Sequence, residues 1–334
     1  VVYNIAGGSD TVTGAAATVT DVLVLNGTTL ANFQHTDTAN DAVTVGAYTD
    51  IDTTLTTLTA VNEETITIGD GAITASAVAN DDFTITTLNA NDMTSLVFTG
   101  LANKVITNAI AGVNGTLTSV DGSANIGTVS VSAANATVGV TMSGSSTAAS
   151  TVIGGSSTDS ITGGSAGDVL TGNGGADTIV SGGGTDVITG GASYDTVTLD
   201  TDSQTVAQGA NDSVATTART FAGVVVAAGD ELTYGNYVDV INSFTAGAGG
   251  DVLDLVNAGV VLATTLAANK NFFASGSWNA LTQMFTIAAN GDGDDTLILS
   301  SQGAGNVDNS LTTNDNAIVL IGVNSDDLVA ANFI

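Results

Sequence analysis

Apolar residues return at short, regular intervals along much of this chain. Between residues 64 and 153 they recur every nine to twelve residues, often as alternating pairs such as Ile66 with Ile68 and Phe83 with Ile85. Clusters of Gly, Asn, Asp and Ser lie between them. Alternation at a period of two predicts strands, and turn residues at this spacing predict a β-solenoid, in which short strands stack coil upon coil.

The first part of the chain carries shorter runs of the same kind. Val19–Leu25 and Ala42–Val45 alternate β-branched or aliphatic residues with polar ones. This pattern predicts an N-terminal β-rich segment over residues 1–63, ahead of the β-solenoid of 64–153. The expected fold class is therefore all-β.

The pattern becomes strictly periodic over residues 154–198. Five blocks of nine residues follow without a break: GGSSTDSIT, GGSAGDVLT, GNGGADTIV, SGGGTDVIT and GGASYDTVT. The sixth place is always Asp, and the eighth is always aliphatic. Glycines near the start of a block permit a tight turn, and the last three residues alternate like a short strand. Each block therefore predicts one turn and one strand, so that two blocks make one coil of a parallel β-roll.

Stacked coils place the aspartates in two columns. Blocks i and i+2 lie about 4.8 Å apart as neighbouring strands, which puts Asp159, Asp177 and Asp195 on one edge and Asp168 and Asp186 on the other. Carboxylates this close repel each other unless a cation lies between them. Ca²⁺ accepts about six to eight oxygen ligands in loose geometry, whereas Mg²⁺ demands a strict octahedron. Adjacent aspartates in the columns therefore predict three complete calcium sites.

The predicted metal sites also use main-chain oxygens of the turns. Their residues are Asp159, Asp168, Asp177, Asp186 and Asp195, with the turn glycines Gly155, Gly164, Gly175, Gly184 and Gly191. A flexible Gly- and Asp-rich linker is the alternative interpretation of this segment. A linker would not keep an apolar residue at every ninth place, so the β-roll is favoured.

The five blocks resemble the nonapeptide GGxGxDxUx of RTX proteins, in register throughout. The departures are Asn173 at the second place, Ser181 at the first, and Ser157, Ala166 and Ser193 at the fourth. We expect these departures to weaken individual sites without destroying the pattern. The resemblance implies a calcium-binding β-roll in a protein exported by a type I secretion channel.

Residues 199–334 also resemble the segment that follows the repeats in many RTX proteins. The similarity lies in YVDVINSFTAGAGGDVLDL (237–255), NGDGDDTLIL (290–299) and the final DDLVAANFI. Aromatic residues gather in this part, which we expect to form a β-sandwich-like cap. In that family the extreme C-terminus is an uncleaved type I secretion signal, and Phe333 with Ile334 fits it. The resemblance implies that the chain leaves a calcium-poor cytosol unfolded and folds where calcium is millimolar.

The charge balance excludes one class of partner. The chain has 334 residues and a formal charge of −30, from 33 acids against Lys104, Arg219 and Lys270. No basic patch exists to displace the counterions of phosphates, so nucleic acid is not an expected partner. Self-repulsion of this size favours expansion unless divalent cations neutralise it. Because 43% of the residues are hydrophobic, the chain is nevertheless expected to fold.

Some residue types and segments are missing from the sequence. Cysteine is absent, so metal rather than disulfides would staple the fold. No run of about eighteen apolar residues predicts a membrane span, and no basic segment followed by an apolar one predicts an N-terminal signal. The chain begins at Val1 rather than Met, as a processed product or part of a longer protein would.

Catalytic patterns are weak. The single histidine, His35, excludes an H-E-x-x-H zinc site. Residues 163–167 match G-x-S-x-G but lie inside a nonapeptide turn rather than between a strand and a helix. With 33 acids, a carboxylate pair for glycoside hydrolysis stays open, although only 4% of residues are aromatic and could stack on a sugar. We therefore expect no enzymatic activity.

These observations favour a structural role outside the cell. The composition is similar in style to RTX-type surface-layer proteins of Gram-negative bacteria, which implies a calcium-dependent lattice of identical chains on the cell surface. Expected partners are copies of the chain, the type I secretion channel during export, and cell-surface polysaccharide. Two alternatives remain open: an adhesin or biofilm-matrix module, and the C-terminal delivery tail of a larger secreted hydrolase.

Overall fold

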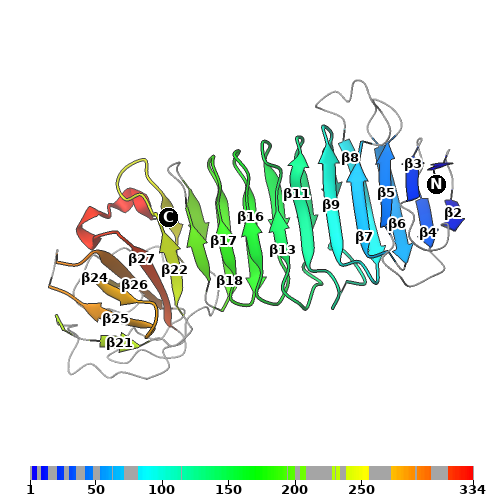
Figure 1. The fold of residues 1–334 in the computed structure, drawn as a ribbon. Coiled ribbons are helices and arrows are strands. Elements are labelled where there is room, and N and C mark those ends of the chain that lie inside the picture. The colour runs from blue at the N-terminus through cyan, green and yellow to red at the C-terminus, as the bar shows by residue number, and fades with distance from the viewer. Residues whose placement is uncertain are drawn as a thin grey trace. The chain divides into compact units, whose positions relative to one another are not determined.

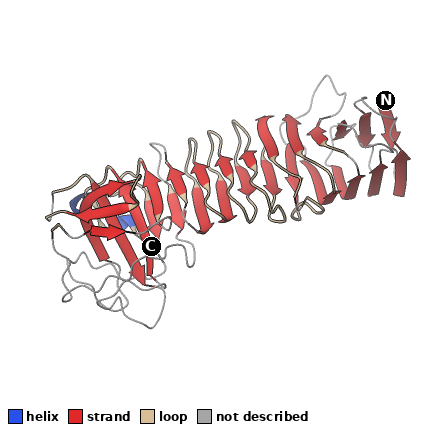
Figure 2. Cartoon of the chain, turned by 60° about the horizontal axis from the view of Figure 1, so that its bottom comes forward, coloured by secondary structure: helices blue, strands red, loops and turns tan. Residues whose placement is uncertain are grey.

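The computed structural model contains two compact units, residues 1–173 and 174–334. Within the ribbon of Figure 1, the residues described are 2–5, 9–13, 21–25, 30–34, 42–47, 53–61, 63–70, 82–113, 115–193, 195–199, 204–207, 228–229, 231–233, 238–255, 272–289, 292–301 and 315–333. Nearly all their regular structure is β, and in this part of the chain no helix is long and apolar enough to cross a membrane. Figure 2 shows the same predominance of strands.

The first unit consists of two parallel sheets, with successive strands added to them alternately. One sheet contains β1 (Val2–Ile5), β3 (Asp21–Leu25), β5 (Ala42–Ala47), β7 (Thr65–Gly69), β9 (Ser95–Gly100), β11 (Ser119–Asn125), β13 (Thr141–Ser143) and β15 (Ser160–Thr162). The other contains β2 (Ser9–Thr13), β4 (Leu30–Gln34), β6 (Thr53–Val61), β8 (Asp82–Ala90), β10 (Asn103–Ile106), β12 (Val129–Ser132), β14 (Ser150–Ile153) and β16 (Val169–Gly174). The predicted all-β fold with a parallel β-solenoid leading into a β-roll is confirmed.

The parallel register stacks like side chains on like. In β7, Ile66 and Ile68 point into the core while Thr65 and Thr67 point outward, as a period of two requires. One buried column runs through six strands of the first sheet: Val43, Ile66, Leu96, Val120, Met142 and Ile161. Each coil therefore buries its apolar face only by stacking on its neighbours.

One inward-facing position of the solenoid carries a cation. Lys104 is fully buried in β10, where its register partners are Phe83 and Val129. Its Nζ donates to Asp70 Oδ1 at 2.5 Å and to the Ala102 carbonyl at 3.1 Å. Burial lowers the pKa of Lys104, and the bond to Asp70 opposes that shift. The charge of Lys104 is thus satisfied inside the fold.

The second unit begins with the same parallel arrangement. One sheet starts with β17 (Thr178–Val180), β19 (Thr196–Thr198) and β22 (Asp239–Asn242); the other contains β18 (Val187–Ala192), β20 (Thr205–Ala207) and β23 (Val252–Asp254). The first sheet then continues through β27 (Asp315–Ile321), β26 (Asp295–Ser301), β24 (Phe272–Asn279), β25 (Met284–Ile287) and β21 (Glu231–Thr233). From β27 onward these strands pair antiparallel.

The antiparallel strands build the aromatic core expected near the C-terminus. Phe272 and Phe285 are buried there with Leu232, Val238 and Val319. Among the described residues, the part of the chain that was predicted to form a sandwich-like cap forms these antiparallel strands of one sheet. The expected segment boundaries after residues 63, 153 and 198 stay predictions.

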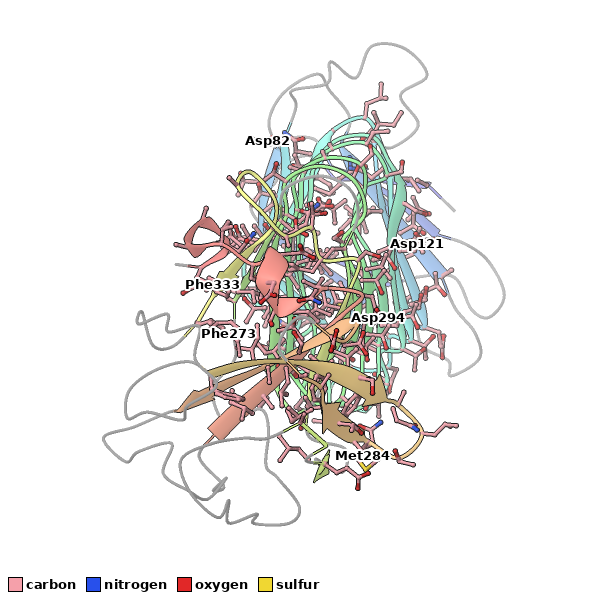
Figure 3. The ribbon with its side chains drawn as sticks, turned by 90° about the vertical axis from the view of Figure 1, so that its left-hand side faces the viewer. Asp82, Asp121, Phe273, Met284, Asp294 and Phe333 are labelled. Carbon is pink, nitrogen blue, oxygen red and sulfur yellow. The ribbon has the colours of Figure 1, made fainter. Side chains whose placement is uncertain are left out.

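The C-terminal segment lies against the last coil of the second unit. Two short 3-10 helices, η1 (Ser325–Asp327) and η2 (Ala330–Asn332), precede an isolated bridge between Phe333 and Leu253 of β23. The rings of Phe333 and Phe273 meet edge to face with centroids 5.0 Å apart. Figure 3 labels both residues. Asn332 is fully buried, so the tail is part of the packed fold.

Candidate metal centre

The sixth-place aspartates of all five nonapeptides are buried. Asp and the aliphatic residue two places later share one face of the chain, as Asp168 and Leu170 do, because side chains alternate along an extended strand. The exposed fraction is at most 2% at each of Asp159, Asp168, Asp177, Asp186 and Asp195. A buried carboxylate is tolerated only where hydrogen bonds or a cation compensate its charge. The hydrogen bonds of each column therefore decide what these aspartates can bind.

In the first unit, main-chain donors hold both oxygens of each carboxylate. Asp159 Oδ1 accepts the Val140 N–H at 2.7 Å, and its Oδ2 accepts the Gly155 N–H at 2.6 Å. Val140 precedes β13 just as Asp159 precedes β15, so the first bond joins two stacked coils. Burial raises the pKa of Asp159, and these two bonds oppose the rise.

Asp168 repeats this arrangement on the other edge. Its Oδ1 accepts the Ser150 N–H and its Oδ2 the Gly164 N–H, each at 2.6 Å. Burial again raises the pKa, against the effect of the two hydrogen bonds. In both blocks the second-place glycine thus donates its N–H to the carboxylate. The predicted sites had assumed that this glycine offers a carbonyl to a metal.

In the second unit the column continues past the nonapeptides. Asp195 Oδ1 accepts the Asp177 N–H at 2.8 Å, and Asp239 Oδ1 accepts the Asp195 N–H at 2.8 Å. Strands β17, β19 and β22 follow these residues in unbroken parallel register, with Thr178 beside Thr196 and Thr196 beside Val240. Asp239 is therefore a further member of the column, although 44 residues separate it from Asp195.

The other edge of the second unit ends differently. Gln204 Oε1 accepts the Asp186 N–H at 2.7 Å, so a neutral amide holds the place of an aspartate. The Gln204 N–H in turn donates to Asp251 Oδ1 at 2.7 Å, and Thr245 donates to Asp251 Oδ2. Gln204 and Asp251 are both fully buried. This column therefore runs from Asp186 through Gln204 to Asp251.

Sequence reasoning missed Gln204, Asp239 and Asp251 as members of the columns. Gln204 keeps the nine-residue spacing but replaces the aspartate, while long insertions precede Asp239 and Asp251. A signal was nevertheless present. Asp239-Val240-Ile241 repeats the Asp-Val-Ile of the fourth nonapeptide, and Asp251-Val252-Leu253 repeats the Asp-Val-Leu of the second. Asp239 is the first residue of β22, and Asp251 directly precedes β23.

The turn glycines leave room for the carboxylates and carbonyls of the columns. A Cβ on Gly154 would collide with Asp159 Oδ2, and one on Gly190 would collide with Asp195 Oδ2. A Cβ on Gly155 would lie 2.6 Å from the Ala136 carbonyl oxygen. The turns therefore bring carboxylate and main-chain oxygens within a few ångströms of each other, where any side chain would intrude.

These donors are the type that calcium prefers. Carboxylate and carbonyl oxygens are hard ligands, and the stacked turns can supply them in the numbers and loose geometry that Ca²⁺ accepts. Among the described residues, no three His, Cys, Asp or Glu side chains converge as a metal cluster. Of the predicted pairs, Asp177 and Asp195 are neighbours in one column of the second unit. The pairs Asp159 with Asp177 and Asp168 with Asp186 have one member in each unit and stay predictions.

Comparison with known proteins supports the same metal. A search of curated proteins finds no match to this chain. Residues 153–188 and 162–197 match the family described as RTX calcium-binding nonapeptide repeat (4 copies). Repeats of this family bind several calcium ions, which agrees with the oxygen-only donors of the turns. Residues 153–197 of this chain are RTX calcium-binding nonapeptide repeats.

Proposed function

We propose that this protein is a secreted, calcium-dependent structural protein that assembles with copies of itself into an extracellular surface layer, without enzymatic activity. The RTX repeats support the broader part of this proposal, a secreted calcium-binding protein. Charge and exposure support self-assembly, and the RTX repeats support secretion by a Gram-negative-type bacterium, on whose surface we place the layer.

The burial of Lys104 is the observation that carries the proposal. Lys104 is one of three basic residues in a chain with a formal charge of −30, and its charge is directed inward to Asp70. It therefore offsets none of the outward-facing carboxylates. Asp82 and Asp92 are exposed in the first unit, and Figure 3 places Asp82 at the periphery of the fold. Two such surfaces repel in monovalent salt and attract when divalent cations bridge them.

The outward faces of the sheets also suit contact between copies. Exposed aliphatic side chains stand on the nonapeptide strands, with Val169, Val180 and Val187 between 38% and 44% exposed. Each valine lies beside a threonine of a neighbouring strand: Val169 beside Thr151, Val180 beside Thr198 and Val187 beside Thr205. A β surface with few lysines has little protection against association with another sheet. Contact between two such faces would bury this apolar area.

Export by a type I channel is part of the proposal. Calcium binding to the aspartate columns would stabilise the roll outside the cell, where the ion is abundant. The packed C-terminal tail adds to this idea, because Phe333 is fixed on Leu253 and Phe273 in the folded state. A channel that recognises the tail would meet it before folding.

The experiment is assembly of the purified full chain. Light scattering and electron microscopy are compared in millimolar Ca²⁺, in Mg²⁺ at equal ionic strength, and in chelator. We expect sheets or filaments in Ca²⁺ that dissolve in chelator and do not form in Mg²⁺. A chain that stays monomeric in Ca²⁺ contradicts the proposal. Glycan binding without self-association would favour the adhesin, and a catalytic domain in the same open reading frame would favour the delivery tail.

A further inference from the structure

The five nonapeptides contain two kinds of turn. In the third to fifth blocks, the second- and fourth-place residues are left-handed, with positive φ whether or not they are glycine. They are Asn173 (φ 77°), Gly175 (109°), Gly182 (86°), Gly184 (99°), Gly191 (121°) and Ser193 (98°). In the first two blocks, all of whose residues are described, neither place is left-handed. The sequence hints at this division only in part. Ser157 and Ala166 replace the fourth-place glycine in the first two blocks, but Ser193 replaces it in the fifth block, where the turn is left-handed.

The sign of φ decides which main-chain group faces the carboxylate. Reversing φ turns over the peptide that precedes the residue, so that its N–H and C=O exchange sides. In the first two blocks the second-place N–H points at the aspartate, as the bonds from Gly155 to Asp159 and from Gly164 to Asp168 show. An N–H directed at the carboxylate compensates its charge and repels a cation. A reversed peptide turns its carbonyl towards that side, where it can act as a calcium ligand with the carboxylate.

A neutral residue closes the same turn one coil earlier. Thr151 pairs in register with Val169, so the preceding residue, Ser150, stands one coil before Asp168. Its Oγ accepts the Ser145 N–H at 2.8 Å, as Asp168 Oδ2 accepts the Gly164 N–H. A Cβ on Gly144 would lie 2.7 Å from this Oγ. A hydroxyl therefore serves where no carboxylate is present, so this form of the turn closes without a metal.

We propose that calcium binds at the turns of the third to fifth nonapeptides, and that Asp159 and Asp168 instead act as metal-independent hydrogen-bond staples. Each staple joins two stacked coils, through Val140 N–H and Ser150 N–H respectively. The calcium-dependent part of the roll thus begins within the matched repeats rather than at their start. This proposal rests on calcium binding by the repeats and is independent of self-assembly.

Hydrogen exchange of the full chain tests the proposal at single amides. The probes in the first unit are the N–H groups of Val140 and Ser150, and the matched probes in the second unit are those of Asp177 and Asp186. On removal of Ca²⁺ with chelator, we expect exchange at Asp177 and Asp186 to accelerate about tenfold or more. Exchange at Val140 and Ser150 should change by less than about twofold. Equal acceleration at all four amides would overturn the proposal.

Calcium titration of variants gives a second, independent readout. Asp168→Ser copies Ser150, and Asp186→Ser is the same change in a left-handed turn. Calorimetry should count as many calcium ions on Asp168→Ser as on the natural chain, and fewer on Asp186→Ser. Circular dichroism in saturating Ca²⁺ confirms that each variant is folded. Loss of a calcium ion from folded Asp168→Ser refutes the staple, and failure of Asp168→Ser to fold even in saturating Ca²⁺ does so too.

Discussion

The side-chain oxygen Oε1 of Gln204 accepts the main-chain N–H of Asp186 at 2.7 Å, which is the bond that an aspartate makes elsewhere in the columns. Gln204 also donates its own N–H to Asp251, so it lies between two carboxylate-bearing coils. A neutral amide at this fully buried place keeps the column stacked while adding no negative charge.

Gln204→Glu should therefore destabilise the calcium-free protein. The new carboxylate keeps the shape of the side chain but is buried between Asp186 and Asp251. We expect the free energy of unfolding at neutral pH to fall by about 2 kcal/mol or more in chelator, because a buried charge lacks compensation. Burial raises the pKa of such a carboxyl, so protonation as the pH is lowered from neutral should restore part of this free energy. Urea unfolding with and without Ca²⁺ measures the effect. Gln283→Glu in an exposed turn is the control, and equal losses would contradict the interpretation.

Gly190→Ala should weaken the fifth turn. The added Cβ collides with Asp195 Oδ2, so either the turn or the carboxylate must move. Overpacking of this kind costs about 1 to 3 kcal/mol, and we expect the affinity for calcium to fall with it. Gly115→Ala is the matched control, because a Cβ there meets no atom within 4 Å. Thermal unfolding and calcium titration of both variants check the prediction, which fails if they behave alike.

The buried lysine predicts a pH dependence at alkaline pH. Burial lowers the pKa of Lys104, so the folded state loses its proton before the unfolded state does. Stability contributed by this residue should rise as pH increases from the folded-state pKa towards the unfolded value of about 10.4. Lys104→Met removes the titration. As the pH rises, the free energy of unfolding of the natural chain should increase relative to that of this variant. A constant difference would show that burial does not perturb Lys104.

Asn332 should hold the C-terminal tail in place. Its Oδ1 accepts the Gly247 N–H, and its Nδ2 donates to the carbonyls of Gly247 and Asp251. Asn332→Ala leaves these buried groups without their partners, which costs about 1 to 3 kcal/mol per group. Carboxypeptidase should then trim the tail faster in Ca²⁺. Asn279→Ala, in an exposed turn, should leave trimming unchanged. Equal rates for both variants would show that the tail is held elsewhere.

Much of the roll could be predicted because its chemistry is local and periodic. The last three residues of the first, third and fifth blocks are the strands β15, β17 and β19, and the predicted stacking at twice the repeat length gives the pairing of Thr178 with Thr196. Burial of every sixth-place aspartate also follows from its two-residue offset from the core position.

The remainder depended on contacts between distant residues. Gln204 replaces the aspartate that defines the repeat, and Asp251 lies 47 residues beyond it, so the nonapeptide pattern did not connect these two residues. The two kinds of turn were equally hidden, because Ser193 adopts a left-handed conformation that its residue type rarely takes, although Asn173 is of a type that tolerates one.

The most direct test is an anomalous-difference map of the full chain crystallised with calcium. We predict calcium peaks at the turns of residues 172–177, 181–186 and 190–195, beside Asp177, Asp186 and Asp195, and no peak at the turns that contain Asp159 and Asp168. Equal peaks at all five turns would contradict the division into staples and calcium turns. A map without calcium at any of them would contradict the whole account.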